Sequence, residues 1–517
     1  MSQVKSNPFL EAVLGQIPRL LGQLNRNALS RSYGSFDRAY WHYRTNDISC
    51  ARYQEAVYTL ALLYCVDFEG NRYFRDKRLL EWIKASLRFT AGIQRKNGSF
   101  DEWYIHEGSY VATAFLTSAV SQTIALFKKN NISLEEEKLI SDVLIKAAEF
   151  LVNRNEEAAL NQVSGAIFAV ANVGTLYGKE KFIGAANRML DKFLSEQRDE
   201  GWWNEYGGPD IGYLSLTINY LEKYSFLLDS SEVSNAISKA KSFVLCFINP
   251  DKTAGGEYMS RNTEYLIPSL TLPYFGALVP AHLDDRYLCY VLYNWLETGI
   301  RAEPKSFESL RGENFFQTSS LLRFSNDKYF LSANGRKGGS FRIYGGGKVY
   351  YDSGLEIDLS KERLSSGILD TKNRVLYEPG KLEIYGSLKK IKEPLLGTKT
   401  AITFKLWQLI FGRFDFFQKI IKNFLRLKMI SYSNRSGILF ERKFLYDSLS
   451  VTIIDLIHGD IPNNKKILFG LKSSYSAVPS SKYAAIPEIN HSLLVPKIEE
   501  KEENGSFILK RIFTFNA

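Results

Sequence analysis

Cysteine and histidine are both scarce in this chain, which has four cysteines and five histidines in 517 residues. Four widely spaced cysteines are too few for a disulfide scaffold, so we expect reduced thiols. The histidines form no spacing such as HxxxH, and we therefore predict no metal site and no cofactor. The residues concerned are Cys50, Cys65, Cys246 and Cys289, and His42, His106, His282, His458 and His491.

Long hydrophobic runs are missing as well. No stretch reaches the length of about twenty apolar residues that a membrane-spanning helix needs. Residues 1–30 have leucines at helical spacing, but Glu11, Gln16, Pro18 and Arg19 interrupt them, which favours an amphipathic helix over a secretion signal. We expect a cytoplasmic protein, and a peripheral position on the inner face of the membrane is compatible with this pattern.

The charge balance is positive, with a net charge of +10. A basic surface attracts nucleic acid, anionic lipid or acidic polysaccharide. No compact Lys/Arg stripe or nucleic-acid motif is present, so we predict no nucleic-acid partner. Aromatic residues make up 14% of the chain, which fits stacking on sugar rings and equally fits a helix-dense core.

The first part of the chain has helical periodicity. Apolar residues recur every three to four positions between residues 51 and 299, and Gly, Asn and Pro mark the connections at 96–99, 207–209 and 249–250. There is no strict internal repeat, which disfavours a solenoid. Antiparallel helices joined in this way predict an (α/α) toroid over residues 1–303.

From about residue 305 onward, the helical period is replaced by alternation of apolar and polar residues. Examples are residues 329–333, 340–344, 449–454 and 506–513, which are separated by Gly, Asn and Asp turns. The pattern predicts an antiparallel β-sandwich over residues 304–517. The predicted fold class is therefore a multidomain α and β protein, with an N-terminal toroid followed by a C-terminal sandwich.

A helical insertion at about 401–430 interrupts the predicted strands. It contains six basic residues and one acid, Asp415, together with an aromatic face that includes Trp407, Phe411 and Phe414. This combination fits a helix lying in an anionic membrane interface. A helix packed on the sandwich, with its lysines in solvent, explains the pattern as well, and the sequence leaves both readings open.

Two polar passages suggest chemistry. Asn161 and Gln162 head one apolar helix, and the passage from Glu205 to Tyr213 precedes another. A side-chain amide can neutralise a sugar carboxylate, and a tyrosine can move a proton. The structural alternatives are an N-cap role for Asn161 and a place in a cleft wall for Tyr213.

These passages resemble the heparinase II/III-like polysaccharide lyases. That family has Asn-His at the head of such a helix, a passage similar to residues 190–205, and its catalytic tyrosine where Tyr213 lies. Residues 334–345 and 349–354 resemble a strand pair of the family's sandwich. The resemblance implies β-elimination on an acidic, uronate-containing polysaccharide, with Asn161 and Tyr213 as catalytic residues. From these passages we also assign substrate binding to Gln162, Trp202, Trp203, Glu205 and Arg342.

The chain departs from the family at its histidine positions. Gln162 follows Asn161, and Lys337 and Gly338 stand where the sandwich motif has histidines. A glutamine cannot act as a general base, so we consider two loops rich in aromatic and charged residues as replacements. They supply His42 and His106 as catalytic candidates, and as substrate-binding candidates Tyr40, Trp41, Arg44, Asp101, Glu102 and Trp103.

A third loop, at 255–265, offers Arg261 to a uronate or sulfate group. Local capping and ring packing explain the first two loops as well, and an ion pair with Glu264 explains the third. The predicted partner is an acidic polysaccharide or a lipid-linked glycan in surface-glycan (exopolysaccharide) biosynthesis or processing. The alternatives are a glycan-binding assembly factor, a hydrolase using Asp101 and Glu205, and, less favoured, a helical scaffold.

Overall fold

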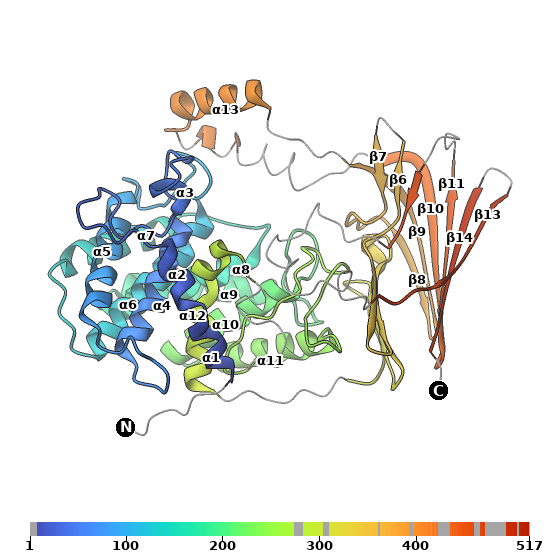
Figure 1. The fold of residues 1–517 in the computed structure, drawn as a ribbon, viewed down its shortest axis with the longest axis horizontal. Coiled ribbons are helices and arrows are strands. Elements are labelled where there is room, and N and C mark those ends of the chain that lie inside the picture. The colour runs from blue at the N-terminus through green and yellow to red at the C-terminus, as the bar shows by residue number, and fades with distance from the viewer. Residues whose placement is uncertain are drawn as a thin grey trace.

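Figure 1 shows the fold in a computed structural model, in which a helical part and a β-sheet part lie side by side. The structure describes residues 8–272, 283–302, 310–359, 362–391, 397–414, 416–418, 420–421, 435–459, 466–470, 493–503 and 506–515. The predicted domain boundary at 303/304 and residues 422–430 of the predicted insertion lie outside these ranges.

Five helices form the inner ring of the helical part. Helix α4 packs on α6, α6 on α8, α8 on α10, and α12 on α4. The hydroxyls of Tyr220 in α10 and Tyr293 in α12 lie 3.2 Å apart and close the ring. The inner helices are α4 (Ala56–Cys65), α6 (Tyr110–Lys129), α8 (Leu160–Tyr177), α10 (Ile211–Leu227) and α12 (Asp285–Arg301).

The other helices cover this ring from outside. Helix α5 packs on α4, α7 on α6 and α8, α9 on α8, and α11 on α10, while α1 and α2 pack on α12. These helices are α1 (Pro8–Gly15), α2 (Ile17–Gln23), α5 (Lys77–Ile93), α7 (Glu137–Val152), α9 (Glu180–Ser195) and α11 (Ser231–Cys246). Two short helices, α3 (Arg38–Trp41) and η1 (Ala51–Glu55), precede α4.

Hydrophobic patterning explains which helices lie inside. In α8 every residue from Ser164 to Gly174 is buried, as expected for a helix surrounded by others. Helix α9 instead buries Phe182, Ala185, Ala186, Leu190 and Phe193, which lie on one face. Among the described helices, α6 alone is long and apolar enough to cross a bilayer, but 83% of its apolar window is buried within the fold.

Two antiparallel sheets form the second part of the molecule. The first contains β1 (Gly312–Phe316), β2 (Leu321–Ser325), β3 (Tyr329–Asn334), β4 (Ser340–Gly345) and β5 (Lys348–Asp352) in that order, with η3 (Gly335–Lys337) between β3 and β4. The second has the order β12-β6-β7-β9-β10-β11-β14-β13, with β8 paired to β9. Its strands are β6 (Glu356–Asp358), β7 (Arg363–Ser365), β8 (Arg374–Glu378), β9 (Lys381–Ile391), β10 (Arg435–Tyr446), β11 (Ser450–His458), β12 (Lys466–Leu468), β13 (Lys497–Glu503) and β14 (Ser506–Thr514).

Strict alternation places one face of each long strand in the core. Strand β11 alternates buried and half-buried residues along its whole length, and β14 does so up to its last residue, Thr514, which is exposed. The core between the sheets also holds four charged side chains with no exposed surface, Asp352, Arg442, Asp455 and Arg511. Each aspartate pairs with both arginines, so the four groups form a closed ring whose charges cancel.

The first sheet is joined to the helical part through the loop between α11 and α12. Arg342 of β4 pairs with Glu257 and Glu264, and Asn334 donates to the Tyr258 carbonyl oxygen at 2.7 Å. The Lys337 ammonium donates to the Met259 carbonyl oxygen and to the side chain of Asn262. The sandwich thus holds residues 257–264 of the helical part in place.

The described part of the insertion contacts the helical part, so the structure does not support the reading in which this helix packs on the sandwich. Helix α13 (Thr398–Phe411) lies above α3 in Figure 1. Its Phe404 contacts Tyr104 edge-on, with ring centroids 5.3 Å apart, and its Lys405 pairs with Asp47. The predicted helical insertion runs to about residue 430, whereas α13 ends at Phe411 with Gly412 as its C-cap.

The charged run near the C-terminus lies in an edge strand. Residues 499–503 belong to strand β13, which pairs with β14 and is exposed along its length. Charged side chains on an edge strand oppose pairing with other chains, which accounts for this composition.

Candidate active site

The candidate site lies where the inner helices begin. Side-chain contacts join the start of α6 to that of α12, and the start of α8 to that of α10. Glu102, just before α6, pairs with Arg286 at the start of α12 at 3.3 Å, and the loop before α10 bonds to the start of α8. Helix N-termini carry partial positive charge and free N–H groups. Several of them together favour an anionic ligand.

Asn161 and Glu205 form a buried pair at the start of α8. The backbone N–H of Asn161 donates to Glu205 Oε1 at 2.6 Å, and its side-chain amide donates to Oε2 at 2.7 Å. Burial raises the pKa of Glu205 well above its usual value, whereas the two hydrogen bonds from Asn161 lower it. Asn161 is therefore not the N-cap, which is Ala159. Gln162 is half-buried beside it.

Tyr213 lies one helix away, in the first turn of α10. Its neighbours are Arg261, Tyr206 and Tyr287. Burial and the nearby Tyr287 raise the pKa of Tyr213 well above its usual value, and Arg261 opposes them. Tyr213 is consequently a neutral phenol at neutral pH.

Arg261 is the cation of this cluster. Its guanidinium lies 4.7 Å from the ring centroid of Tyr206, and its Nε is buried without a hydrogen-bond partner in the described part of the chain. Asp210 fixes the backbone around it, because Asp210 caps α10 and accepts from the N–H groups of Arg261 and Thr263. A buried donor with spare capacity beside two tyrosines is suited to an anionic group.

A second group of side chains continues the site toward α6. Tyr287 packs against Tyr290, with ring centroids 5.7 Å apart, and Tyr290 accepts a hydrogen bond from Arg286. The Arg286 guanidinium lies 3.8 Å from the centroid of Trp103. Trp103 is 62% exposed, so one face of an indole held by a cation is available to a ligand. Glu102 is buried and pairs with the same arginine.

The loop that carries Trp103 also holds Asp101, His106 and Glu107. Asp101 accepts from the backbone N–H groups of His106 and Gly108, and Glu107 accepts from those of Glu102 and Trp103. Burial and the neighbouring Glu102 raise the pKa of Glu107 to about 8. Burial and Arg95 lower the pKa of His106, so its imidazole is neutral near pH 7. The groups whose charges act on His106 are Arg95, Asp101 and Arg413.

The candidate residues in the loop at 33–44 contact other parts of the helical domain than Tyr213. His42 is exposed and packs between Trp41 and Tyr43. Trp41 donates to the Gln23 carbonyl oxygen, Tyr40 packs on Phe89, and Arg44 is exposed. Among the described contacts, none connects His42 or His106 with Asn161 or Tyr213. A histidine base for Tyr213 is therefore not assembled in this conformation.

Besides Glu102 and Glu205, three further residues assigned to substrate binding are buried. Trp203 is 2% exposed, stacks on Phe193 at 4.8 Å and donates to its carbonyl oxygen. Trp202 is 3% exposed and donates to Glu200. Arg342 is 3% exposed and is neutralised by two glutamates. All three side chains are engaged in contacts between elements of the fold, which leaves them little surface for a substrate.

Four residues around the site were missed by sequence reasoning: Asp210, Arg286, Tyr287 and Lys337. Asp210 and Asp284 stand before apolar helices, which is an N-cap signal that could have located both helix starts. Burial lowers the pKa of Lys337 to about 7, although Asp210 and Glu257 raise it. The residues next to Lys337 in the sequence do not predict its contact with Asn262, in a loop 75 residues earlier.

Gly338 explains one departure from the histidine pattern. Its φ is +59°, and a Cβ atom there would lie 2.1 Å from the Ser366 carbonyl oxygen. No side chain fits this backbone without rearrangement, so a histidine at this position is excluded by packing.

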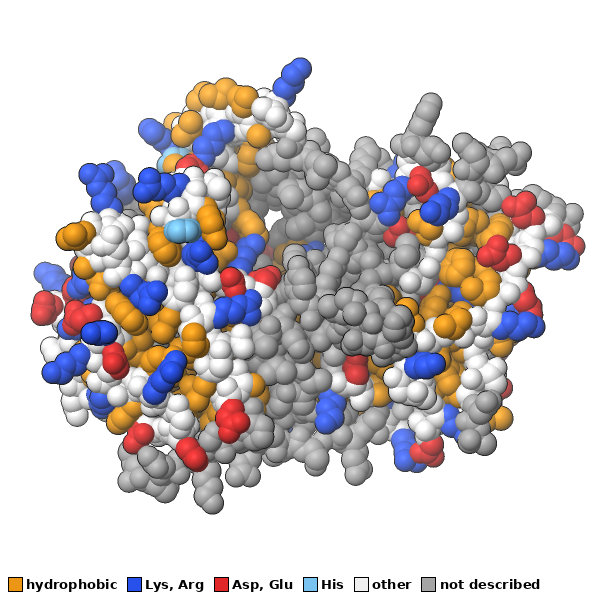
Figure 2. All heavy atoms as spheres, viewed as in Figure 1, with side chains coloured by type: hydrophobic (Ala, Val, Ile, Leu, Met, Phe, Trp, Pro, Cys, Tyr) orange, Lys and Arg blue, Asp and Glu red, His pale blue; other side chains and the backbone are white. Residues whose placement is uncertain are grey.

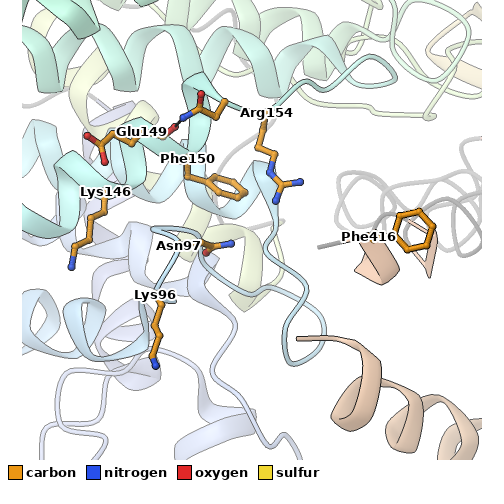
Figure 3. Close-up of a pocket in the computed structure, with 8 residues that line it drawn as sticks. Lys96, Asn97, Lys146, Glu149, Phe150, Arg154 and Phe416 are labelled. Carbon is orange, nitrogen blue, oxygen red and sulfur yellow. Dashed lines mark hydrogen bonds between the residues drawn. The ribbon is translucent and has the colours of Figure 1, made fainter. Parts of the chain in front are cut away.

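A basic groove lies outside this cluster. It has a volume of about 710 Å³ and is lined by Lys96, Asn97, Lys146, Glu149, Phe150, Asn153, Arg154 and Phe416. Figure 3 shows Phe416, which follows α13, across the groove from the α7 residues. Within the described ranges, no group of three or more His, Cys, Asp or Glu side chains is placed to hold a metal ion.

Comparison with known proteins gives the fold. No family model and no curated protein sequence matches the chain. Among solved structures, a chondroitin AC lyase from Streptomyces coelicolor A3 in complex with chondroitin sulphate has a TM-score of 0.55 and 10% identity, over 88% of this chain and 67% of that one. Heparinase III has a TM-score of 0.40 and 13% identity, over 88% and 78%. Heparan sulfate lyase HepC from Pedobacter heparinus has a TM-score of 0.40 and 9% identity, over 89% and 70%.

The last two TM-scores are too low to carry an argument, but the first similarity extends over both the helical part and the sandwich. It confirms the predicted fold class, an (α/α) toroid followed by an antiparallel β-sandwich. At this identity it establishes the fold alone. The chain shares a polysaccharide lyase-like fold with this chondroitin AC lyase.

Proposed function

We propose that the protein binds an acidic, uronate-containing polysaccharide at the starts of the inner helices and acts on it by β-elimination. The observation that carries this proposal is the buried Arg261 guanidinium, which lies beside Tyr206 and Tyr213 and whose Nε has no hydrogen-bond partner among the described residues. Trp103 and Arg286 extend the site with an exposed ring and a second cation. The fold of the solved lyase supports this assignment by analogy only.

The elimination needs a base, an acid and a group that neutralises the sugar carboxylate. The base removes the proton on the carbon beside the carboxylate, a double bond forms, and the C–O bond to the leaving sugar breaks. Arg261 and the nearby helix N-termini would stabilise the negative charge that develops on the carboxylate. Tyr213, a neutral phenol in the free protein, would first lose its proton to solvent, because Arg261 beside it favours the phenolate. The phenolate would take the proton from the carbon, and the phenol so formed would give that proton to the leaving oxygen.

The contacts of Asn161 favour a second candidate, a glycan-binding assembly factor without lyase activity. The amide of Asn161 already donates to Glu205, so a substrate carboxylate would have to compete with a buried carboxyl group. Gln162, Lys337 and Gly338 also replace the family's histidines. In this reading Arg261, Arg286 and Trp103 bind an acidic glycan that is not cleaved. A hydrolase with Asp101 and Glu205 is less favoured, because Asp101 is bonded to loop N–H groups and Glu205 to Asn161.

We further propose a biosynthetic setting for this site. A basic protein of the cytoplasm would meet its acidic glycan as a lipid-linked precursor at the inner face of the membrane. The net charge of +10 and the apolar side chains exposed on α13 support this placement.

The test is incubation of the purified chain with soluble uronate polymers, followed by the ultraviolet absorbance of the unsaturated product. The lyase proposal expects product formation that Tyr213→Phe abolishes and that Tyr43→Phe, at a 60% exposed ring, leaves unchanged. A flat trace for the wild type, combined with binding that Arg261→Ala weakens, selects the assembly factor. Neither product nor Arg261-dependent binding with any acidic polymer would contradict both proposals.

A further inference from the structure

The outer face of α13 is an exposed apolar surface. Ile402 is 57% exposed, Leu406 54%, Leu409 45% and Ile410 58%. Their spacing of three and four residues places them on one side of the helix. The opposite side carries Phe404, which packs on Tyr104, and the buried Gln408. Two large rings continue the apolar surface beyond the helix, Phe414 at 59% and Phe416 at 69% exposure.

Single exposed leucines are ordinary on protein surfaces, but a contiguous row of large apolar side chains is not. Figure 2 shows the hydrophobic side chains along the crest of the molecule over α13, with lysine and arginine side chains around them. A soluble helix that needed only to cover the loops at 42–47 and 101–108 would present polar residues outward. The row therefore points to a partner.

The charge beside the row identifies the kind of partner. Lys399 and Arg413 are exposed in the same segment, and the basic groove contributes Lys96, Lys146 and Arg154. The carboxylate in the groove, Glu149, is paired with Lys181 at 2.8 Å. Phe416 lines the groove opposite these cations (Figure 3), so the apolar surface and the basic groove adjoin.

We propose that this face docks on an anionic lipid bilayer. The side chains of Ile402, Leu406, Ile410 and Phe414 enter the interface, and the cations of the groove bind the lipid phosphates. The segment lies over the loops that carry Trp103 and His106, so docking brings that end of the toroid next to the membrane. Only the idea that a lipid-linked glycan is delivered there rests on the proposed function.

The test is flotation of the full chain with vesicles of phosphatidylcholine containing phosphatidylglycerol, and with vesicles of phosphatidylcholine alone. We expect flotation with the anionic vesicles only, weakened by salt. The double variant Leu406→Ser and Ile410→Ser should lower the partition coefficient by about tenfold or more. Leu439→Ser is the matched control, because Leu439 in β10 is also 54% exposed, and it should float like the wild type.

The groove is tested separately. Lys96→Glu with Lys146→Glu should weaken flotation by about fivefold per cation, whereas Lys348→Glu, an exposed lysine of the sandwich, should have no such effect. Unchanged thermal unfolding of all variants establishes that they fold. Equal flotation of the apolar double variant and the wild type overturns the proposal. A second outcome would also overturn it: the wild type forms a stable dimer that does not float, and the apolar double variant dissociates that dimer. The row would then cover a second copy of the chain. The elimination assay uses soluble polymers and no membrane. Its result is therefore independent of the flotation result.

Discussion

Replacement of Asp455 by asparagine should destabilise the sandwich strongly. Asp455 Oδ1 lies 2.5 Å from Arg442 Nε, and its Oδ2 lies 2.6 Å from Arg511 Nη2. The four charged groups of the ring have no exposed surface, and two arginines with two aspartates sum to zero charge. Asp455→Asn leaves one uncompensated positive charge there and turns an amide donor toward a guanidinium.

The expected cost follows from that geometry. Removing one partner of a buried ion pair costs about 3–5 kcal/mol, because the remaining charge stays buried without compensation. Burial opposes ionisation of Asp352, yet Arg442 and Arg511 hold its pKa well below its usual value. A depressed carboxyl pKa stabilises the fold above the pKa of the unfolded chain, and this stabilisation is lost as the pH falls. The ring should therefore also make the sandwich sensitive to acid.

Hydrogen exchange of β10, β11 and β14, followed by mass spectrometry, measures this effect locally. Fluorescence would report mainly on the toroid, because the seven tryptophans lie before residue 303 or at position 407. A loss of about 3 kcal/mol corresponds to exchange that is about 100-fold faster. Glu499→Gln, in an exposed pair with Lys497, is the control and should leave exchange unchanged. Equal exchange in the two variants would refute the reasoning.

Three further predictions concern the toroid and its junction with the sandwich. Glu107→Gln keeps both backbone hydrogen bonds, which end on one oxygen, and removes a group whose pKa is raised to about 8. Since a raised carboxyl pKa destabilises the fold as the pH rises, the variant should melt higher than the wild type above pH 8 and equally below pH 4.5; an equal gain at both pH values would contradict this. Trp203→Ala should cost about 3–5 kcal/mol of unfolding free energy, and Trp103→Ala far less, in calorimetry of both; similar losses would show that burial does not separate the two rings. Gly338→Ala should lower the melting temperature clearly, because its Cβ would meet the Ser366 carbonyl oxygen; an unchanged melting temperature would mean that the backbone there adapts easily.

The site could be predicted from the sequence in part. Asn161, Arg261, Trp103 and Tyr213 lie in loops or first turns of inner helices, where polar residues before an apolar helix signal a helix start. The sequence did not separate Trp103 from Trp203, although both stand in aromatic-rich loops. The difference is that the Trp203 ring stacks on Phe193 of the preceding helix and is buried, whereas the Trp103 ring lies against Arg286 and is 62% exposed.

The order of a toroid and a sandwich was determined by the sequence alone. Burial of apolar side chains at helical or alternating spacing is a local property of the chain, so periodicity reveals it. The partners of charged and polar side chains were decided by the tertiary structure. Glu205 accepts a hydrogen bond from Asn161, 44 positions earlier in the chain, and Arg342 pairs with glutamates about 80 positions earlier. Helix α13, which is inserted between strands of the sandwich, packs on Tyr104 of the helical part. A buried polar group needs a partner, but nothing in its neighbouring residues says which distant segment supplies one.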